Sequence, residues 1–476
     1  MVSKLGVWKA VQSFTSSNVN HKPIFTPTEL NKYYAKVTSC DLNVSLTKPT
    51  TFKQVNSYFT LPKITPGRMI ECLKAIKKRE SITEDAMGLS PKMIKLTLGC
   101  PHVFDSLLSI INNSISSSHF PTQCKKSVIV LIPKINAPTV LSDYRPISIQ
   151  TNLAKIVEKC VSTCLIDYVN ESSMLSPLQF GFRKNSSSEH AFLAINDYIQ
   201  KNLSENKVVV TVQLDLTKAF DKVNHVLLLK KLQWYGIDEC WFTSYLQGRS
   251  HITKCNEEVS VEAHPQSGVP QGSILGPLLF TIFVNDLPDV IQHCLPILYA
   301  DDTHLCHAAT SSNLNELEHD VKSDLQKIHE WMTTNGMLLN LKKCKYITIC
   351  PQREKMIPTL NLFLDSHELE CCTKIKSLGV ITDNKAKWTD HINDICRRAN
   401  YRISTLQPII RLMFIANGKL LLSAYVLSLL RYCVTIWGNA TKTDLNNVNK
   451  CVRCCTRMLY RKSKFDSISG ELKTLE

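Results

Sequence analysis

The sequence predicts an α+β fold whose centre is a split βαβ antiparallel sheet with helices packed on one face. Two observations carry this prediction. Between residues 207 and 350 the pattern runs strand, helix, strand pair, helix, strand, which is the order of a split βαβ unit. Beyond residue 385 the chain becomes mainly helical and increasingly basic, so a helical region follows the sheet.

The first elements are a bland N-terminal segment and a hairpin. Residues 1–115 mix Ser, Thr, Asn and Lys with short helical runs and hold no cluster of chemically useful groups, so we expect an extension or linker. The runs SVIVLIPK, ending at Lys134, and DYRPISI, beginning at Asp143, predict a hairpin. Residues 207–215, KVVVTVQLD, predict a buried strand that ends on an acid, and residues 218–232 predict the helix after it.

Later elements complete the sheet. LPILYADDTHLCH predicts two strands joined by a turn at residues 300–302. Apolar residues recur every three or four positions from 314 to 331, an Asn-Gly pair ends this helix, and the strand KKCKYITIC follows. The apolar stretch at 420–430 is about half as long as a membrane span. It predicts a buried helix, and no membrane partner is expected.

The charge balance points to a polyanionic partner. Lys and Arg number 56 against 41 Asp and Glu, a net charge of +15, and nucleic acid is the first candidate. The 19 cysteines are an odd number, and no apolar signal segment opens the chain, so we interpret them as free thiols. Cys451 and Cys454 form a CxxC that lacks a second ligand pair, which argues against zinc. We therefore expect an intracellular protein of the nucleus or cytoplasm, not a secreted one.

Three acids form the candidate metal site. Asp301 and Asp302 are adjacent, and like charges this close are stable together only near cations. Such turns are common on surfaces, but this one stands between the apolar runs ILY and THLC. Asp215 ends the preceding predicted strand, and because neighbouring strands lie about 4.8 Å apart, the three carboxylates can converge. Hard oxygen ligands suit Mg²⁺, and two such ions about 3.5–4 Å apart promote in-line phosphoryl transfer.

The acids belong to a series of motifs in a characteristic order. The motifs are LIPK ending at Lys134, DYRPIS at 143–148, QFGFRK at 179–184, LDLTKAFDKV at 214–223, GVPQGSILGPLLF at 268–280, YADD at 299–302, LNLKKCK at 339–345 and SLGV at 377–380. Several are short, but their joint presence in this order makes coincidence negligible. Over about residues 120–476 the chain resembles the reverse transcriptase of a non-LTR (LINE-type) retrotransposon and is most similar to the jockey-like insect group.

This resemblance implies a right-hand polymerase. Fingers and palm are expected over residues 120–384 and a helical, basic thumb over residues 385–476, with more of the thumb expected beyond. It implies an RNA-directed DNA polymerase that uses Mg²⁺, or Mn²⁺ in its place, with an RNA template, a DNA primer and deoxynucleoside triphosphates. A gag-like protein is a further expected partner. Full-length relatives carry an N-terminal endonuclease, and we expect this chain to be a fragment that lacks it.

The family's catalytic roles carry over to matching positions. Three carboxylates match the acids of the metal cluster, and one lysine matches the group thought to protonate the departing pyrophosphate. Because Lys342 and Lys345 lie close by, the choice of lysine stays open. Cys344 stands where the family often has Thr, a small change that we expect to be tolerated. The matching catalytic residues are Asp215, Asp301, Asp302 and Lys343.

Five residues match positions that bind the incoming nucleotide. Lys134 and Arg145 match the basic pair that closes over the triphosphate, for which an arginine fork and a mobile ammonium are suited. Phe220 matches the aromatic gate that excludes a 2′-hydroxyl; ordinary helix-start core packing is its alternative. Gln271 and Gly272 lie where a polar side chain and bare backbone can approach nucleotide and template.

A last group matches positions that bind the template and primer. Neutralising phosphates releases counterions, so such binding is strongly salt dependent. A run of basic residues is often only a solvated helix face. The basic patch beyond residue 385 as a whole is therefore a better candidate for binding nucleic acid than any one of its residues. The group comprises Arg183, Gly379 of the primer-grip hairpin, Lys450, Arg453, Arg457 and Arg461.

Two other functions compete with reverse transcription. One is a catalytically inactive retrotransposon relic that only binds RNA, because such copies often decay. The intact acids, Gln271 and Arg145 favour the enzyme. The other is an RNA-dependent RNA polymerase, which is disfavoured by Phe220 and by Ala300, where those enzymes usually have Gly.

Overall fold

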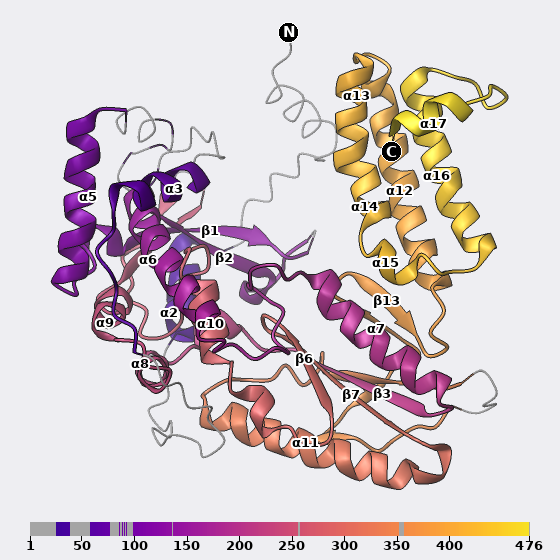
Figure 1. Cartoon of the computed structure of the whole chain (residues 1–476), viewed down its shortest axis with the longest axis horizontal. Helices are drawn as coiled ribbons and strands as arrows, with labels where there is room; N and C mark the ends of the chain where they lie inside the picture. Colours follow the sequence, from indigo (N-terminus) through magenta and orange to yellow (C-terminus); the bar gives the residue numbers. More distant parts are fainter. Residues whose placement is uncertain are drawn as a thin grey trace.

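A five-stranded sheet forms the centre of the molecule (Figure 1), in the strand order β11-β8-β3-β7-β6. The computed structural model describes residues 25–38, 58–76, 85, 88, 90, 92, 99–135, 137–255, 258–351 and 357–475. Strands β6, β7, β3 and β8 pair antiparallel, as predicted, and β11 adds parallel to β8. The strands are β3 (Val208–Leu214), β6 (Leu295–Tyr299), β7 (Asp302–Ala309), β8 (Lys345–Ile349) and β11 (Glu370–Cys371).

Helices cover both faces of this sheet, and the prediction of helices on one face is wrong. Helix α11 (Leu314–Thr334) packs on one face and α7 (Ser188–Ser204) on the other (Figure 1). Along β3, Val210 shares a buried cluster with α11, and its neighbour Val209 shares one with α7. The physical reason is the run VVVTV, which is apolar on both sides and therefore needs a layer on each face.

A second sheet lies beside the first and has the order β2-β1-β4-β5. The predicted hairpin is present, because β1 and β2 pair antiparallel with Ile132 opposite Arg145. Strand β4 runs parallel to β1. The strands are β1 (Lys126–Pro133), β2 (Tyr144–Gln150), β4 (Ser250–Cys255) and β5 (Glu258–Val259).

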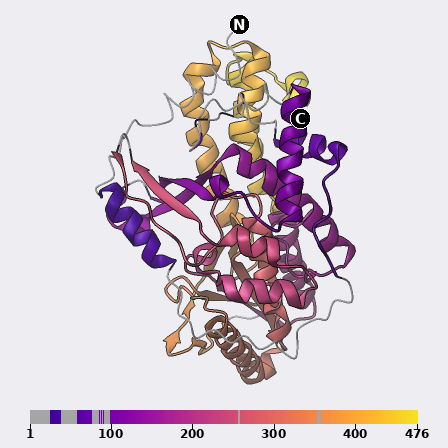
Figure 2. The ribbon, with the colours of Figure 1, turned by 90° about the vertical axis from the view of Figure 1, so that its left-hand side faces the viewer.

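Parts of the N-terminal segment pack onto these sheets. Helix α2 (Pro27–Val37) lies against β4, as Figure 2 shows in indigo. Met69 of α3 (Pro66–Ile76) and Ile111 of α5 (Pro101–Ser116) are fully buried in the main core. Helices α3 and α5 therefore share the main hydrophobic core, whereas Leu30 and Tyr34 of α2 belong to a smaller cluster with Tyr144.

The remaining helices and strands connect the two sheets or follow the central one. Helix α10 is mostly hydrophobic and is buried apart from Pro277, as expected for a helix inside a core. The elements are α6 (Asn152–Glu171), α8 (His225–Trp234), α9 (Cys240–Leu246), α10 (Gly276–Phe283), β9 (Phe363–Leu364), β10 (His367–Glu368), β12 (Lys374–Ser377) and β13 (Val380–Asp383).

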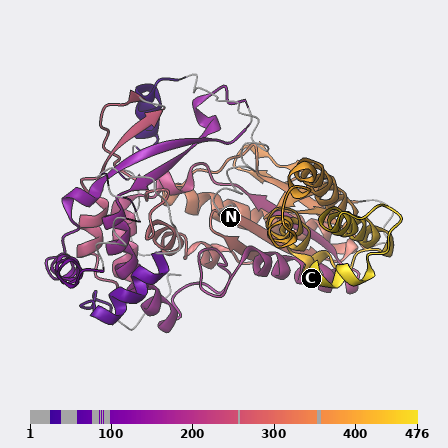
Figure 3. The same ribbon diagram turned by 90° about the horizontal axis from the view of Figure 1, so that it is seen from above.

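The C-terminal region is a helical bundle (Figure 3), and Phe192 of α7 and Val380 join its buried cluster. The stretch predicted as a buried helix spans α13, a π-helical turn at Ser423–Leu427 and α14, and Leu422 and Val426 within it are buried. No helix in the described part of the chain is both long and apolar enough to cross a membrane. The bundle comprises α12 (Thr389–Ile410), α13 (Ile415–Leu422), α14 (Ser428–Arg431), α15 (Val434–Trp437), α16 (Lys442–Tyr460) and α17 (Ser469–Leu475).

Buried His391 on α12 makes the bundle sensitive to acid. Its Nδ1 accepts a hydrogen bond from the Ile381 backbone N–H at 3.4 Å, and burial lowers its pKa to about 4. An unfolded histidine titrates near pH 6.5, so the unfolded state binds more protons as pH falls from about 6.5 to 4, and stability is lost in that window.

We expect His391→Gln, which keeps an acceptor but does not titrate, to flatten the pH dependence of the melting temperature. The difference should reach about 1–3 kcal/mol near pH 4 and vanish above pH 7. Thermal melts from pH 4 to pH 8 measure it, and parallel curves for variant and wild type would contradict the assignment.

Candidate active site

Three acids meet at one end of the central sheet. Asp215 directly follows β3, and Asp301 and Asp302 form the turn between β6 and β7. Strands β3 and β7 pair with Leu214 opposite Thr303, so the register sets Asp215 beside Asp302. The antiparallel pairing of the two strands therefore produces the convergence that the sequence pattern predicts.

These acids repel one another in partly buried surroundings. Burial, together with the charges of Asp301 and Asp215, raises the pKa of Asp302 to about 6. Burial also raises the pKa of Asp301, with Asp215 adding to the effect, whereas Arg145 and Lys343 oppose it. Burial and mutual repulsion thus both disfavour the ionised forms of Asp301 and Asp302.

The donor chemistry at this turn fits a hard divalent cation. Partly buried, mutually repelling carboxylate oxygens are the ligands that Mg²⁺ prefers. Among the described residues, no group of three or more Asp, Glu, His or Cys side chains is arranged to hold an ion. The Asp215 carboxylate instead accepts a hydrogen bond from Lys343 Nζ at 3.1 Å. A metal site here is therefore supported by charge and ligand type, and not by a preformed ligand set.

The turn after α11 fixes Asp215 and distinguishes the three candidate lysines. Lys343 contacts Asp215 and lines the same cleft, which is not lined by Lys342 or Lys345. Cys344 Sγ lies 3.5 Å from the Asp215 backbone nitrogen, whose N–H it accepts. The cysteine that departs from the family pattern therefore helps to hold the Asp215 backbone.

The QFGFRK segment packs against the backbone of the acidic turn at Ala300. A Cβ on Gly181 would come within 2.2 Å of the Ala300 nitrogen, so only glycine permits this approach. Gln179 Oε1 accepts hydrogen bonds from both backbone nitrogens, Gly181 at 2.7 Å and Ala300 at 3.2 Å. Arg183 donates to the Ser176 carbonyl at 2.8 Å and lines a different hollow, away from the acids.

Phe220 forms the aromatic wall of the cleft. Its ring stacks on Phe280 with centroids 4.5 Å apart, and Phe182 approaches it edge-on at 6.0 Å. The ring is half-buried and also lines the cleft, so it both packs on the core and faces the site. Its backbone carbonyl accepts a hydrogen bond from Val269 at 2.8 Å, which joins it to the Gln271 loop.

The loop containing Gln271 and Gly272 is attached to β2 and to the helical turn that follows β3. Gln271 Nε2 donates to the buried Asp221 carboxylate at 2.8 Å, and its carbonyl accepts from the Ser148 N–H at 2.7 Å. Gly272 has a φ of +117°, and a Cβ there would lie 2.6 Å from the Ser148 carbonyl oxygen. The side chain of Gln271 and the backbone of Gly272 are thereby held at the cleft wall.

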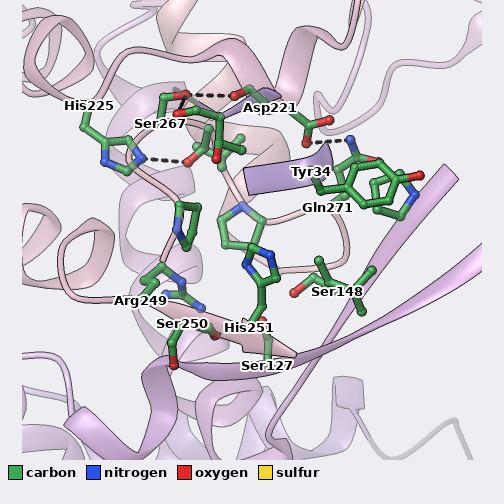
Figure 4. Close-up of a pocket in the computed structure, with 17 residues that line it drawn as sticks. Tyr34, Ser127, Ser148, Asp221, His225, Arg249, Ser250, His251, Ser267 and Gln271 are labelled. Carbon is green, nitrogen blue, oxygen red and sulfur yellow. Dashed lines mark hydrogen bonds between the residues drawn. The ribbon is translucent and has the colours of Figure 1, made fainter. Parts of the chain in front are cut away.

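Behind this loop lies a smaller hollow (Figure 4). Ser267 donates to the Asp221 carbonyl at 3.0 Å and to the Thr38 carbonyl, just beyond α2, at 2.7 Å. His225 Nε2 lies 2.8 Å from the Gly268 carbonyl oxygen. The loop is therefore hydrogen-bonded to the N-terminal segment at Thr38 and to α8 at His225.

Basic residues line the opposite wall of the cleft. Lys134 Nζ donates to the Ser142 carbonyl at 2.8 Å, and its pKa is lowered by burial and by the charges of Arg145, Lys218 and Lys343. The cleft has a volume of about 820 Å³ and also contacts residues that the sequence pattern did not single out. Among these are Tyr34, Phe182, Lys218 and Asn340. Phe182, Lys218 and Asn340 lie inside three of the family motifs. Tyr34 lies outside these motifs, and no sequence pattern marks it as a site residue.

Gly379 lies in the two-residue turn of the β12–β13 hairpin. Leu378 and Gly379 both have positive φ, 46° and 87°. A Cβ on Gly379 would come 3.1 Å from the ring of Tyr432, whose hydroxyl donates to the Leu378 carbonyl at 2.6 Å. The turn is therefore packed against the helical bundle.

The basic residues of α16 lie apart from the cleft. Lys450, Arg453 and Arg461 are exposed, and Arg461 donates to the Arg411 carbonyl at 3.0 Å. In Figure 1, α12 and α13 stand between α16 and strands β1 and β2. Lys450, Arg453, Arg457 and Arg461 do not line the cleft.

Comparison with known proteins identifies the family. A family model described as reverse transcriptase (RNA-dependent DNA polymerase) matches residues 132–382, more than half of the chain. A probable RNA-directed DNA polymerase from transposon BS of Drosophila melanogaster is 26% identical, over 95% of this chain and 53% of its own length.

Two further relatives agree. The RNA-directed DNA polymerase from mobile element jockey of Drosophila melanogaster is 26% identical, over 72% of this chain and 38% of its own length. A Pol polyprotein from the type-1 retrotransposable element R1 of Bradysia coprophila is 22% identical, over 82% and 39%. The chain spans about half or less of the length of these relatives. It belongs to the reverse transcriptase (RNA-dependent DNA polymerase) family.

Proposed function

We propose that this protein is an RNA-directed DNA polymerase that extends a DNA primer on an RNA template with deoxynucleoside triphosphates. The observation that carries the proposal is the meeting of Asp215, Asp301 and Asp302 at one end of the central sheet, where Asp215 and Asp301 line a cleft that Lys134 and Arg145 also line. Acids that bind cations and cations that bind phosphates are both required for phosphoryl transfer.

The chain's own residues divide the chemistry between them. Asp215, Asp301 and Asp302 would hold two Mg²⁺ ions, or Mn²⁺ ions in their place, which supply the charge that activates the primer 3′-hydroxyl and stabilises the leaving pyrophosphate. Lys343 hydrogen-bonds Asp215 and is the candidate to donate a proton to that leaving group. These assignments require the acids to be ionised at neutral pH.

The cleft walls select the nucleotide. Lys134 and Arg145 hold the triphosphate, since a guanidinium fork and an ammonium both suit phosphate oxygens. Phe220 lies under the sugar, where a stacked, braced ring leaves no space for a 2′-hydroxyl. Gln271 and Gly272 contact the nucleotide and template from the side.

We assign fingers and palm to residues 120–384 and the thumb to residues 385–476. The buried cluster of the C-terminal bundle supports this boundary, because its buried members other than Phe192 and Val380 all lie beyond residue 385. We propose that the thumb and the Gly379 turn hold the template–primer duplex, with Arg183 and the α16 residues meeting parts of the nucleic acid outside the cleft. A gag-like protein as partner and a place of action in the nucleus or cytoplasm complete the proposal.

Primer extension tests the function directly. Purified protein is given a primed RNA template, deoxynucleoside triphosphates and Mg²⁺, with chelator in a parallel reaction. We expect Mg²⁺-dependent DNA product. RNA binding without any DNA product would support the alternative, which is a catalytically inactive relic. That alternative is considered because retrotransposon copies often decay.

Arg145→Ala separates nucleotide binding from duplex binding. We expect its apparent KM for deoxynucleotides to rise about 10-fold with little change in template affinity, because Arg145 lines the triphosphate side of the cleft. Neutralising Lys450, Arg453, Arg457 and Arg461 together should instead weaken template binding and reduce its salt dependence. Steady-state kinetics and filter binding measure the two effects, and identical defects would refute the division.

A further inference from the structure

Helix α2 is anchored as part of the polymerase core. Leu30 and Tyr34 are buried in a cluster with Tyr144 of β2. Asn31 donates to the Val261 carbonyl at 2.7 Å and accepts from the Thr253 hydroxyl at 2.9 Å. A loosely attached linker would not have a buried asparagine satisfied by specific partners, so α2 has a fixed position over this wall.

Tyr33, a partly buried residue of α2, contacts Lys218 of the LDLTKAFDKV motif. Lys218 Nζ donates to the Tyr33 hydroxyl at 2.6 Å and lies 4.0 Å from the centre of the Tyr33 ring. Lys218 has a φ of +51°, a left-handed conformation that is unfavourable for a residue with a Cβ. Such strain persists where surrounding contacts fix it, and Tyr33 supplies one of them.

Lys218 is the fourth cation of the cleft. It lines the cleft together with Lys134, Arg145 and Lys343, and its charge is one of those that lower the pKa of Lys134. Burial lowers the pKa of Lys218 itself to about 8, and Asp221 opposes the shift. Cations crowded in this way repel one another, and a polyanion bound among them would relieve that repulsion.

We propose that Lys218 binds the triphosphate of the incoming nucleotide and that Tyr33 of α2 is a positioning residue that orients its ammonium. The inference rests on the proposed polymerase function, because the polyanion is the nucleotide substrate. Under this proposal, α2 is a structural part of the nucleotide site. The sequence pattern alone assigns the segment that contains α2 to an extension or linker.

The test measures nucleotide affinity apart from turnover. Equilibrium binding of dTTP to the full chain with primer–template is measured in Ca²⁺, and KM and kcat for dTTP in Mg²⁺. We expect Lys218→Ala to weaken dTTP binding about 10-fold and Tyr33→Phe about 3-fold, each through KM rather than kcat. Lys218→Arg should restore much of the affinity, because it retains the charge.

Lys222→Ala is the matched control, since it removes a charge from the same turn but does not line the cleft, and it should bind dTTP like wild type. Unchanged dTTP affinity in Lys218→Ala overturns the inference. A Tyr33→Phe variant that melts earlier but binds dTTP normally shows that Tyr33 is only structural. Failure of wild type to extend a primer while binding dTTP would overturn the proposed polymerase activity alone.

Discussion

Asp301→Asn is expected to reduce Mg²⁺-dependent primer extension by about 10³-fold or more, while the fold and RNA binding survive. Asp301 lies in the partly buried turn where Asp215 and Asp302 also carry charge. Removing one carboxylate charge takes away several kcal/mol of the cation binding on which phosphoryl transfer depends. Asp215→Asn should have a comparable effect, because the same register places it at the site.

Stability separates this loss from misfolding. Burial and the nearby charge of Asp215 both disfavour an ionised Asp301. A neutral side chain at this position removes that cost, so Asp301→Asn should melt at the same temperature as wild type or higher. Asp197→Asn, an exposed acid on α7, is the matched control and should extend primers like wild type. Extension by Asp301→Asn at the wild-type rate would show that the turn is not catalytic.

Phe220→Val is expected to increase ribonucleotide incorporation relative to deoxynucleotide on the order of 10- to 100-fold. The ring is held between Phe280, on which it stacks, and the edge of Phe182. Replacing it with a smaller side chain opens space at the cleft wall where the sugar would lie. The ratio of kcat/KM for a ribonucleotide and its deoxynucleotide measures the change.

Phe220→Tyr is the matched control, because it keeps the ring and should keep the discrimination. Loss of the stack with Phe280 will also cost Phe220→Val some stability, which thermal melts report separately. A destabilised Phe220→Val with an unchanged sugar ratio would assign the ring to the core alone.

Much of the local structure follows from the sequence alone. Apolar alternation and helical period predict β1, β2, β3, β6, β7, β8 and α11 because these signals are local and repeat within each element. The acids at Asp215, Asp301 and Asp302 are found the same way, since each stands at the end of an apolar run. The family motifs add the identity of the cleft residues.

Only the tertiary structure decided which segments meet. Helix α7 covers the second face of the sheet, Gly181 fits under Ala300, and Lys343 rather than Lys342 or Lys345 reaches Asp215. No pattern in the sequence predicts that Lys218 donates a hydrogen bond to Tyr33, which lies 185 positions before it. Periodicity within a segment records which side of an element is buried, whereas contacts between distant segments depend on how whole layers pack, and no local pattern encodes that.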